Sequence, residues 1–559
     1  MKYRSSEILS KIMFAENRAL YKSMGFSDSD LKGPVIGIAN SWNELVPGHY
    51  NLRNVAEFVK KGIYRAGGAA VEFGVIGACD AQACGHIGMK YILLTRDLIA
   101  FDIEAMVQAH RLDGIVLLGS CDKIVPGMLM AAARLDIPAI LVVGGPMSGG
   151  IEFDGRKSDS TSVSEAVGML SSGLISKEDL FRLEENAAPS CGSCSYYGTA
   201  NSMGCAAESM GMSITGSSLI PATSSARLRA AEETGRKIVE LINEGITARS
   251  IITKDSLENA AKIMVATGGS TNTFIHLSAI ANEIGIDPET MMDIYDRASD
   301  KIPSIAMVNP ASKYDMEDFY RAGGIPQVMK ELGEDIDLSC LTVTGKELGE
   351  NLKNWSNSFG VDRRVIRTKE DPFSRSGGLA VLRGNLAPGT GITKPIAMDP
   401  SMHFFSGPAK VFECEEEANE AILSGKIKEG DVIVIRYEGP KGGPGMREMY
   451  FAMKLLYGQG LAKKTALITD GRFSGTNNGC FVGHISPEAA EGGPIAIIKD
   501  GDIITIDVKN KKIDVALSDE EIRERLKNWK RPAEEKIKGI LGIYAKLAAS
   551  AAEGGMIKI

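Results

Sequence analysis

The amino-acid sequence predicts an α/β protein with two parts, a domain built on a parallel sheet and a β-rich domain that resembles a barrel. In the first part, apolar runs typical of buried strands alternate with segments of helical periodicity. Beyond it, the chain changes to short β-like runs separated by glycine. A chain of 559 residues is also longer than a domain with a single hydrophobic core normally is. We therefore expect an α/β domain over residues 1–380 and a β-rich domain over residues 381–559.

The first part alternates predicted strands and helices. The apolar runs that predict strands lie at 34–40, 70–78, 115–118 and 137–145. The apolar spacing of a helix is found at 51–64 and again at 98–110. Such alternation implies a parallel sheet with right-handed crossovers, so the loops that follow the strands should meet along one edge.

Reactive side chains follow two of these strands. Cys79 and Asp80 come after the second strand, and Cys121, Asp122 and Lys123 come after the third. A thiolate suits iron-sulfur chemistry, whereas a carboxylate suits Mg²⁺. Neighbouring ligands of opposite softness therefore suggest a cluster and a divalent ion that act on one substrate at this edge of the sheet.

The second part is predicted to be mostly strand. Its β-like runs lie at 410–413, 431–439, 465–471, 493–501 and 502–517. The Gly- and Pro-rich segment 381–402 is predicted to cross between the domains, and 519–549 to form a terminal helix that breaks at its only proline. In the glycine-bounded loop 469–479, Ser474 lies in a tight turn that could present its hydroxyl, or could bond its own backbone.

Composition excludes several classes of protein. A formal charge of −8 without a basic run argues against nucleic-acid binding. No apolar run has the length of a membrane span, and the first residues lack a signal-peptide core, so we expect a cytoplasmic protein. Nine cysteines, an odd number, indicate thiols and metal ligands rather than a disulfide framework, and Cys191 and Cys194 form a Cys-x-x-Cys pair that suits such ligation.

Six long segments identify a family resemblance. In chain order they read CDKIVPGMLMAAARL, SCGSCSYYGTANSM, ATGGSTNTFIHL, SGGLAVLRGNLAPGTG, RYEGPKGGPGMREM and TDGRFSGTNNGCFVGHISPEA. Together they resemble the dihydroxyacid dehydratase and phosphogluconate dehydratase family over nearly the whole chain. The resemblance implies dehydration of a 2,3-dihydroxy carboxylic acid to a 2-keto acid. It also implies an iron-sulfur cluster, Mg²⁺, and a homodimer whose site lies between an α/β and a β-rich domain.

The resemblance implies that Cys121 and Cys194 hold the cluster. Members with a [2Fe-2S] cluster usually have cysteine where this chain has Gly48, so that third ligand is missing here. Other members also have glycine there and use a [4Fe-4S] cluster, which we favour, while [2Fe-2S] stays possible. Either Cys79 or Cys191 could supply the third thiolate. Cys79 is similar to the phosphogluconate and sugar-acid branch of the family and Cys191 to the glycine-bearing dihydroxyacid branch, and chain order does not choose between them.

The resemblance also implies roles for five further residues. Asp80, Asp122 and Glu448 would bind Mg²⁺, and Lys123 would contribute through a carbamate on its amine. The alternative for the lysine is an ion pair with one of these acids. Ser474 would be the base, acting as an alkoxide. Because a free serine is far too weakly acidic, neighbouring cations and backbone donors would have to lower its pKa.

Three functions remain open. The leading one is dehydration of 2,3-dihydroxyisovalerate in branched-chain amino-acid synthesis, supported by LRGNLAPGTG and GCFVGHISPEAAEGGP. A sugar-acid dehydratase, acting on an aldonate or 6-phosphogluconate, is supported by Cys79, Ala81, Gln82, Asn477 and Asn478. The third is a non-enzymatic iron-sulfur protein, which would not need the serine and the magnesium ligands together. If the serine is not the base, the histidines of VPGH and VGHIS (His49 and His484) are the next candidates.

Overall fold

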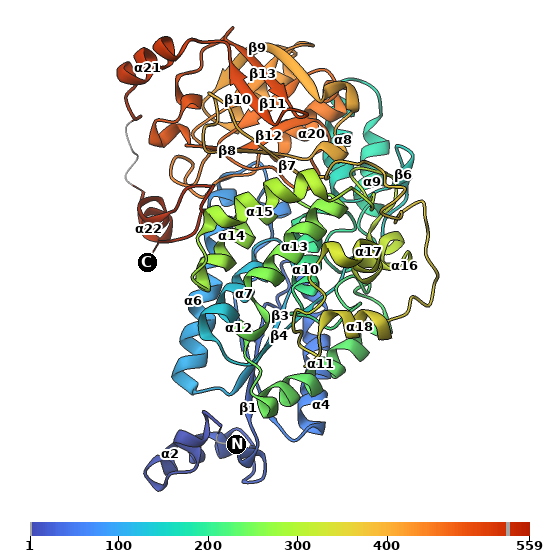
Figure 1. Cartoon of the computed structure of the whole chain (residues 1–559), viewed down its shortest axis with the longest axis vertical. Helices are drawn as coiled ribbons and strands as arrows, with labels where there is room; N and C mark the ends of the chain where they lie inside the picture. Colours follow the sequence, from blue (N-terminus) through green and yellow to red (C-terminus); the bar gives the residue numbers. More distant parts are fainter. Residues whose placement is uncertain (1–2, 533–536, 559) are drawn as a thin grey trace.

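A computed structural model describes residues 3–532 and 537–558. It contains two main sheets, one in each half of the chain (Figure 1). The first is a four-stranded parallel sheet in the order β2-β1-β3-β4. Its strands are β1 (Val35–Asn40), β2 (Ala69–Gly74), β3 (Gly114–Gly119) and β4 (Ala139–Val143). All four predicted strands of the first half are therefore confirmed.

Helices cover both faces of the first sheet, which is why β1, β3 and β4 are buried along their whole length. The helices next to it are α4 (Leu52–Arg65), α6 (Ile92–His110), α7 (Ile124–Leu135) and α11 (Ser225–Glu244). Helices α4 and α11 cross closely, because a Cβ on Gly62 would lie 2.1 Å from the carbonyl oxygen of Glu232.

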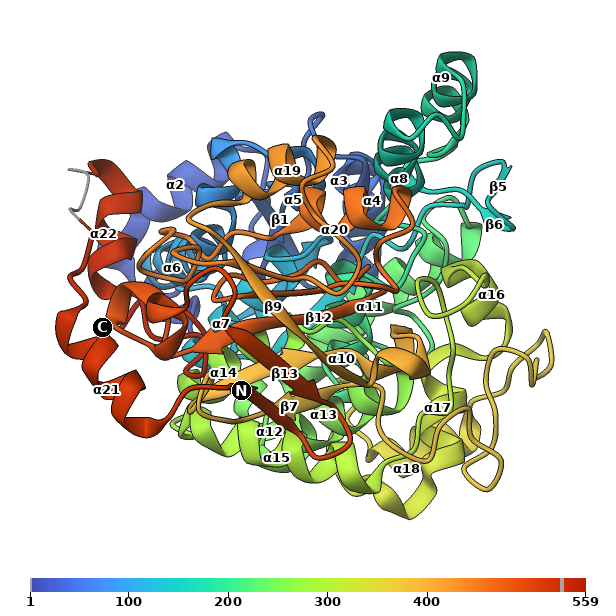
Figure 2. The same ribbon diagram turned by 90° about the horizontal axis from the view of Figure 1, so that it is seen from above.

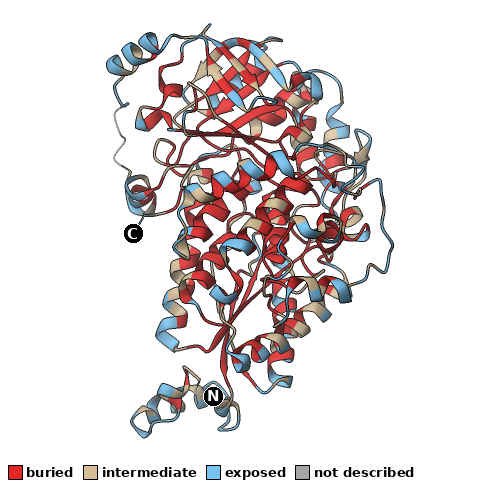
Figure 3. Ribbon diagram, in the orientation of Figure 1, coloured by how far each residue is buried: buried red, intermediate tan, exposed pale blue. Residues whose placement is uncertain are grey.

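A further helical layer lies between the two sheets (Figure 1). Its helices are α10 (Thr199–Ser209), α13 (Lys254–Thr267), α14 (Thr273–Glu283) and α15 (Pro288–Lys301). Further helices of this half are α2 (Ala15–Ser23), α5 (Asp80–Ala83), α8 (Ser160–Ser171), α9 (Lys177–Asn186) and α17 (Gly324–Leu332). Buried residues are concentrated in the centres of both sheets and in this layer (Figure 3).

The second sheet has eight strands in the order β14-β13-β9-β10-β11-β12-β8-β7. They are β7 (Ala380–Leu382), β8 (Thr390–Thr393), β9 (Phe404–Phe412), β10 (Val432–Ile435), β11 (Ala466–Thr469), β12 (Cys480–Ser486), β13 (Ile503–Asp507) and β14 (Lys512–Val515). Strands β9 to β12 are parallel neighbours, and the flanking pairs are antiparallel. A bridge between Arg383 and Lys512 brings the two edges together, so the sheet is nearly closed like a barrel. The predicted fold class is thus confirmed. Figure 2 shows this sheet from above.

Three predictions for the second half need comment. The segment 381–402 is more than a crossing, because it includes β8 and most of β7. The run 493–501 is not a strand: residues Pro494–Ile497 form a 3-10 helix, as expected when proline removes a donor that a sheet would need. The terminal helix is indeed broken, into α21 (Asp519–Asn528) and α22 (Gly539–Leu547). None of the helices in the described part of the chain combines the length and the apolar character needed to cross a bilayer.

Candidate functional site

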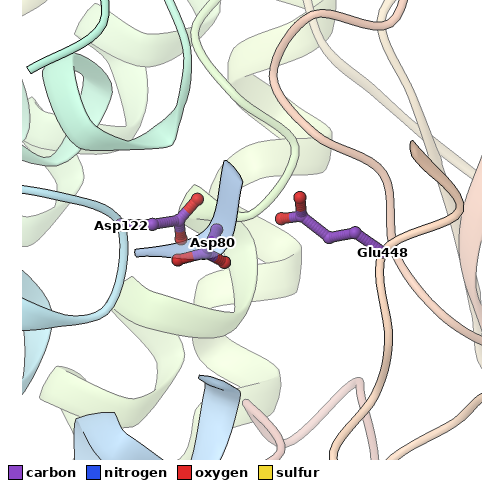
Figure 4. A group of neighbouring side chains, drawn as sticks. All are labelled: Asp80, Asp122 and Glu448. Carbon is purple, nitrogen blue, oxygen red and sulfur yellow. The ribbon is translucent and has the colours of Figure 1, made fainter. Parts of the chain in front are cut away.

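Three carboxylates from distant parts of the chain meet where the two halves face each other. Asp80 begins α5, Asp122 follows β3, and Glu448 precedes α20 (Tyr450–Gly458). One oxygen from each lies within 4.8 Å of the other two, and Figure 4 shows Glu448 pointing across at the two aspartates. The sequence placed both aspartates at one sheet edge, and the fold brings the glutamate to them from the second half.

Lys123 lies among these carboxylates with no exposed surface. Its Nζ donates to Asp80 Oδ2 at 2.7 Å and to the carboxylate of Asp122, and lies 4.0 Å from Glu448 Oε1. This is the ion pairing expected of an unmodified lysine. Three acids gather around one amine, so their charge is only partly compensated by it.

Arg472 is the second buried cation of the group, and the sequence reasoning missed it. Its guanidinium donates to Glu448, approaches Asp80 Oδ2 at 3.3 Å, and donates to the carbonyl of Met446 at 2.6 Å. Burial raises the pKa of Glu448 to about 7, and the charge of Arg472 opposes that rise. Only one feature of the sequence indicated a role for Arg472, which is its position two residues before Ser474 in a motif of the resemblance.

The donor set fits a hard divalent cation. Carboxylate oxygens are the ligands that Mg²⁺ prefers. The buried Oδ1 of Asp80 has no hydrogen-bond partner among the described residues, so it is available to a further group. Buried carboxylate oxygens are rarely left without a partner in folded proteins. The site is therefore chemically suited to a metal ion.

Two neutral side chains from the helical layer support the acids. The Nδ2 of Asn272 donates to Glu448 Oε1 at 2.9 Å, and Nε2 of His276 lies 3.4 Å from Asp122 Oδ1. Burial, together with the charges of Lys123 and other cations, lowers the pKa of His276 well below its ordinary value. Both residues belong to the segment ATGGSTNTFIHL, whose place in the resemblance was the only indication of a role.

Three of the four cysteines considered as cluster ligands line one cavity beside these acids. They are Cys79, Cys121 and Cys194, and the lining does not include Cys191. A hydrogen bond with Cys121 lowers the pKa of Cys79, and the same bond together with burial raises that of Cys121. Burial raises the pKa of Cys194 to about 12. The geometry thus groups Cys79, rather than Cys191, with the other two.

The surroundings of Cys121 are unusually restricted. Its φ of 69° lies in the left-handed region, which non-glycine residues adopt uncommonly. A Cβ built on Gly48 would lie 2.8 Å from Cys121 Sγ, which is closer than real side chains approach. The glycine at this position is therefore what leaves room for the Cys121 thiol.

Ser474 lines the same cavity and is nearly buried. Its Oγ accepts a hydrogen bond from the hydroxyl of Thr476 at 3.3 Å. The turn lies against the start of α10, because a Cβ on Gly475 would be 2.8 Å from the Cα of Gly198. The structure thus places the hydroxyl of this turn at the cavity.

The two alternative bases lie elsewhere. His49 contacts the carbonyl of Ser41 through Nδ1 at 2.7 Å, and neither His49 nor His484 is among the residues that line the cavity. Both ring nitrogens of His484 are buried without a partner in the part of the chain that the structure describes. Neither histidine is placed to serve the cavity directly.

The remaining lining is mostly apolar or aromatic. It includes Ala81, Cys84, Tyr196, Ala200 and Tyr450. Of the residues that favoured a sugar acid, Cys79 and Ala81 line the cavity, whereas the polar residues Gln82, Asn477 and Asn478 do not. Gln82 instead donates to the carbonyl of Leu45 at 2.9 Å. The polar groups in this part of the lining are the hydroxyls of Tyr196, Thr199 and Tyr450.

Comparisons with known proteins agree with the geometry. Residues 33–351 match the family model for the N-terminal part of dihydroxy-acid/6-phosphogluconate dehydratases, and residues 364–555 match the model for the C-terminal part. The chain is 52% identical to a protein named dihydroxy-acid dehydratase from Caldanaerobacter subterraneus subsp. tengcongensis, with 99% of each chain covered. It is 50% identical to one of the same name from Pyrococcus furiosus, covering 99% of this chain and 100% of that one. The chain therefore belongs to the dihydroxy-acid/6-phosphogluconate dehydratase family of enzymes.

Proposed function

We propose that this enzyme dehydrates a 2,3-dihydroxy carboxylic acid to a 2-keto acid with the help of an iron-sulfur cluster and Mg²⁺. The observation that carries the proposal is the convergence of three carboxylates, three of the four candidate cluster thiols and one serine on a single cavity. Hard oxygen ligands and soft sulfur ligands side by side match a reaction that must bind a carboxylate and also labilise a hydroxyl.

Asp80, Asp122 and Glu448 are the proposed Mg²⁺ ligands, with Lys123 contributing as a carbamate. Their separation and the free Oδ1 of Asp80 support this assignment. When bound, the ion supplies a positive charge for the substrate carboxylate and C2 oxygen. Asn272 orients Glu448 by a hydrogen bond, as residues behind a metal ligand commonly do. The positive charge of Arg472 instead competes with the ion for the same carboxylate.

Cys121, Cys194 and Cys79 are the proposed cluster ligands, and a [4Fe-4S] cluster is favoured. The shared cavity and the hydrogen bond between Cys79 and Cys121 support Cys79 over Cys191. When bound, a cluster with one iron free of protein ligands supplies a Lewis acid for the C3 hydroxyl.

Ser474 is the proposed base. Its Oγ, as an alkoxide, takes the proton from C2 while the C3–O bond breaks, and the protonated serine then passes that proton to the departing hydroxide, which leaves as water and regenerates the alkoxide. The resulting enol tautomerises to the 2-keto acid. The start of α10 lies against this turn, and the free N–H groups of a first helical turn favour negative charge nearby.

The preferred substrate is 2,3-dihydroxyisovalerate, an intermediate of branched-chain amino-acid synthesis. An apolar wall can accept a branched alkyl group, whereas a sugar acid needs hydrogen-bond partners for each extra hydroxyl. The name shared by the relatives supports the same choice. We further propose separate domains over 1–380 and 381–559, a homodimer, and a cytoplasmic location. The change from one family model to the next between residues 351 and 364 supports two domains.

The test uses protein reconstituted without oxygen and offered 2,3-dihydroxyisovalerate, gluconate, arabinonate and 6-phosphogluconate. We expect 2-keto acid mainly from the first, while preference for a sugar acid would support the alternative. Ser474→Ala should retain iron, sulfide and Mg²⁺ but lose about 10² to 10⁴ in turnover. It should also fail to exchange the C2 hydrogen with solvent. Ser401→Ala, at an exposed serine of the same half, is the matched control.

Turnover of Ser474→Ala within about tenfold of the parent would reject the serine as base. For the carbamate, Lys123→Ala should keep its iron but lose Mg²⁺ affinity and activity. ¹³C-labelled bicarbonate should give a carbamate NMR signal in the parent that is absent from this variant. An active Lys123→Ala would reject the carbamate.

A further inference from the structure

Two buried lysines lie behind the serine turn. Lys394 follows β8, and its Nζ donates to the carbonyl of Gly475 at 3.0 Å. Lys454, in α20, donates through Nζ to the carbonyl of Thr476 at 3.2 Å. Their exposed fractions are 2% and 1%. Two ammonium groups therefore bind consecutive carbonyls directly after Ser474.

The two lysines differ in how their charge is compensated. Lys454 forms an ion pair with Glu165 Oε1 at 2.8 Å, and Glu165 also pairs with Arg156 at 2.7 Å. Among the residues that the structure describes, no carboxylate oxygen lies within 4.0 Å of Lys394 Nζ. Its hydrogen-bond acceptor is the carbonyl of Gly475. A buried ammonium with one neutral acceptor is costly, and such groups are normally paired.

The pKa of Lys394 reflects this cost. Burial, followed by the charge of Lys454, lowers its pKa to about 7. Lys454 is the charged neighbour that acts on it. A nearby negative charge would offset the cost.

The group that could become negative is in the same turn. Ser474 precedes Gly475 directly, and the hydroxyl of Thr476 donates to Ser474 Oγ. Charges act strongly over short distances in a protein interior, because water does not screen them there. Lys394 is thus a buried cation that binds the residue directly after the proposed base and has no carboxylate partner among the described residues.

We propose that Lys394 is a positioning residue for this reaction, which holds the turn through Gly475 and favours the alkoxide of Ser474 by its buried positive charge. The inference rests on the proposed function, specifically on Ser474 as the base. Lys394 acts through the turn and need not touch the substrate. A purely structural role would tie β8 to the turn without influencing the charge on the serine.

The experiment compares Lys394→Met and Lys394→Arg in the reconstituted holoenzyme. We expect Lys394→Met to keep its iron, sulfide and Mg²⁺. Its kcat should fall by about 10- to 100-fold, as is common when a residue that supports a reactive group is replaced, and its KM should be nearly unchanged. The acid limb of its kcat/KM profile should move to higher pH, since the alkoxide is harder to form. Lys394→Arg should restore most of the activity. Lys463→Met, at a lysine whose side chain is 70% exposed, is the control and should match the parent.

A second measurement keeps the proposal testable if Lys394→Met folds poorly. Lys394→Ala leaves space for a small amine, so added ethylammonium should raise its kcat. Absence of any rescue, together with an unshifted pH profile of Lys394→Met, overturns the proposal. In the Ser474→Ala background, Lys394→Met should have no further effect, because the two residues act as one unit.

The two proposals fail differently. If Ser474→Ala is active, the proposed base is wrong. If Ser474→Ala is inactive while Lys394→Met behaves like the parent, the role of Lys394 alone is overturned.

Discussion

Replacing Arg472 by methionine removes one of the two cations buried among the three carboxylates. The guanidinium has no exposed surface and contacts both Glu448 and Asp80. Without it, three acids face only Lys123. Breaking a buried ion pair by removing one partner typically costs about 3 to 5 kcal/mol, because the remaining charge is left uncompensated. We expect the free energy of unfolding of the metal-free protein to fall by about that amount.

The effect of Mg²⁺ on Arg472→Met should have the opposite sign. Removal of a neighbouring cation strengthens the attraction of the acids for a divalent ion. A ligand that binds only the folded state stabilises it by about 2.7 kcal/mol at a concentration 100 times Kd. Added Mg²⁺ should therefore raise the melting temperature of Arg472→Met more than that of the parent, and the assay is thermal unfolding with and without the ion.

The matched control is Arg134→Met. Arg134 also pairs with two carboxylates, those of Glu104 and Glu283, in another part of the chain. Its replacement should lower stability without changing the response to Mg²⁺. The reasoning is refuted if metal-free Arg472→Met is as stable as the parent, or if Mg²⁺ stabilises both proteins equally.

Three further predictions concern the thiols and one buried histidine. Cys79→Ser should lose iron and visible absorbance on reconstitution, whereas Cys191→Ser should keep both, because only the first lines the cavity. Gly48→Ala should lower cluster occupancy, since its Cβ would lie 2.8 Å from Cys121 Sγ and displace the thiol. Burial lowers the pKa of His49 from 6.5 to about 4, so the stability it contributes is present above pH 6.5 and is lost as the pH falls toward 4. Between pH 7 and 5 the parent should lose about 2 kcal/mol more of its unfolding free energy than His49→Gln, as measured by denaturant titration.

Each of these has a contrary outcome. If Cys191→Ser lost iron and Cys79→Ser did not, Cys191 rather than Cys79 would be the third cluster ligand. Full cluster content in Gly48→Ala would show that Cys121 can move without loss of its role. If the unfolding free energies of His49→Gln and the parent changed with pH in the same way, folding would not lower the pKa of His49. His110→Gln, at an exposed position, is the control for the last measurement and should follow the parent.

Local patterns in the sequence were sufficient for the scaffold of the first half. The run PVIGIAN forms β1, and GIVLLG forms β3, because a continuous apolar run suits a strand covered on both faces. The position of Asp80 and Asp122 at one sheet edge follows from the same parallel arrangement. Periodicity was less informative in the second half, where the apolar run containing Ile495 became a 3-10 helix.

The sequence by itself determined the family resemblance and the residue types of the site, whereas the tertiary structure decided which of them share a cavity. Cys79 rather than Cys191 lines the cavity with Cys121 and Cys194, and spacing along the chain does not encode this grouping. The role of Arg472 likewise emerged only from its contacts with acids far away in the chain. The physical reason is that a charge can be buried only when its partners are supplied, and here they come from segments hundreds of residues apart.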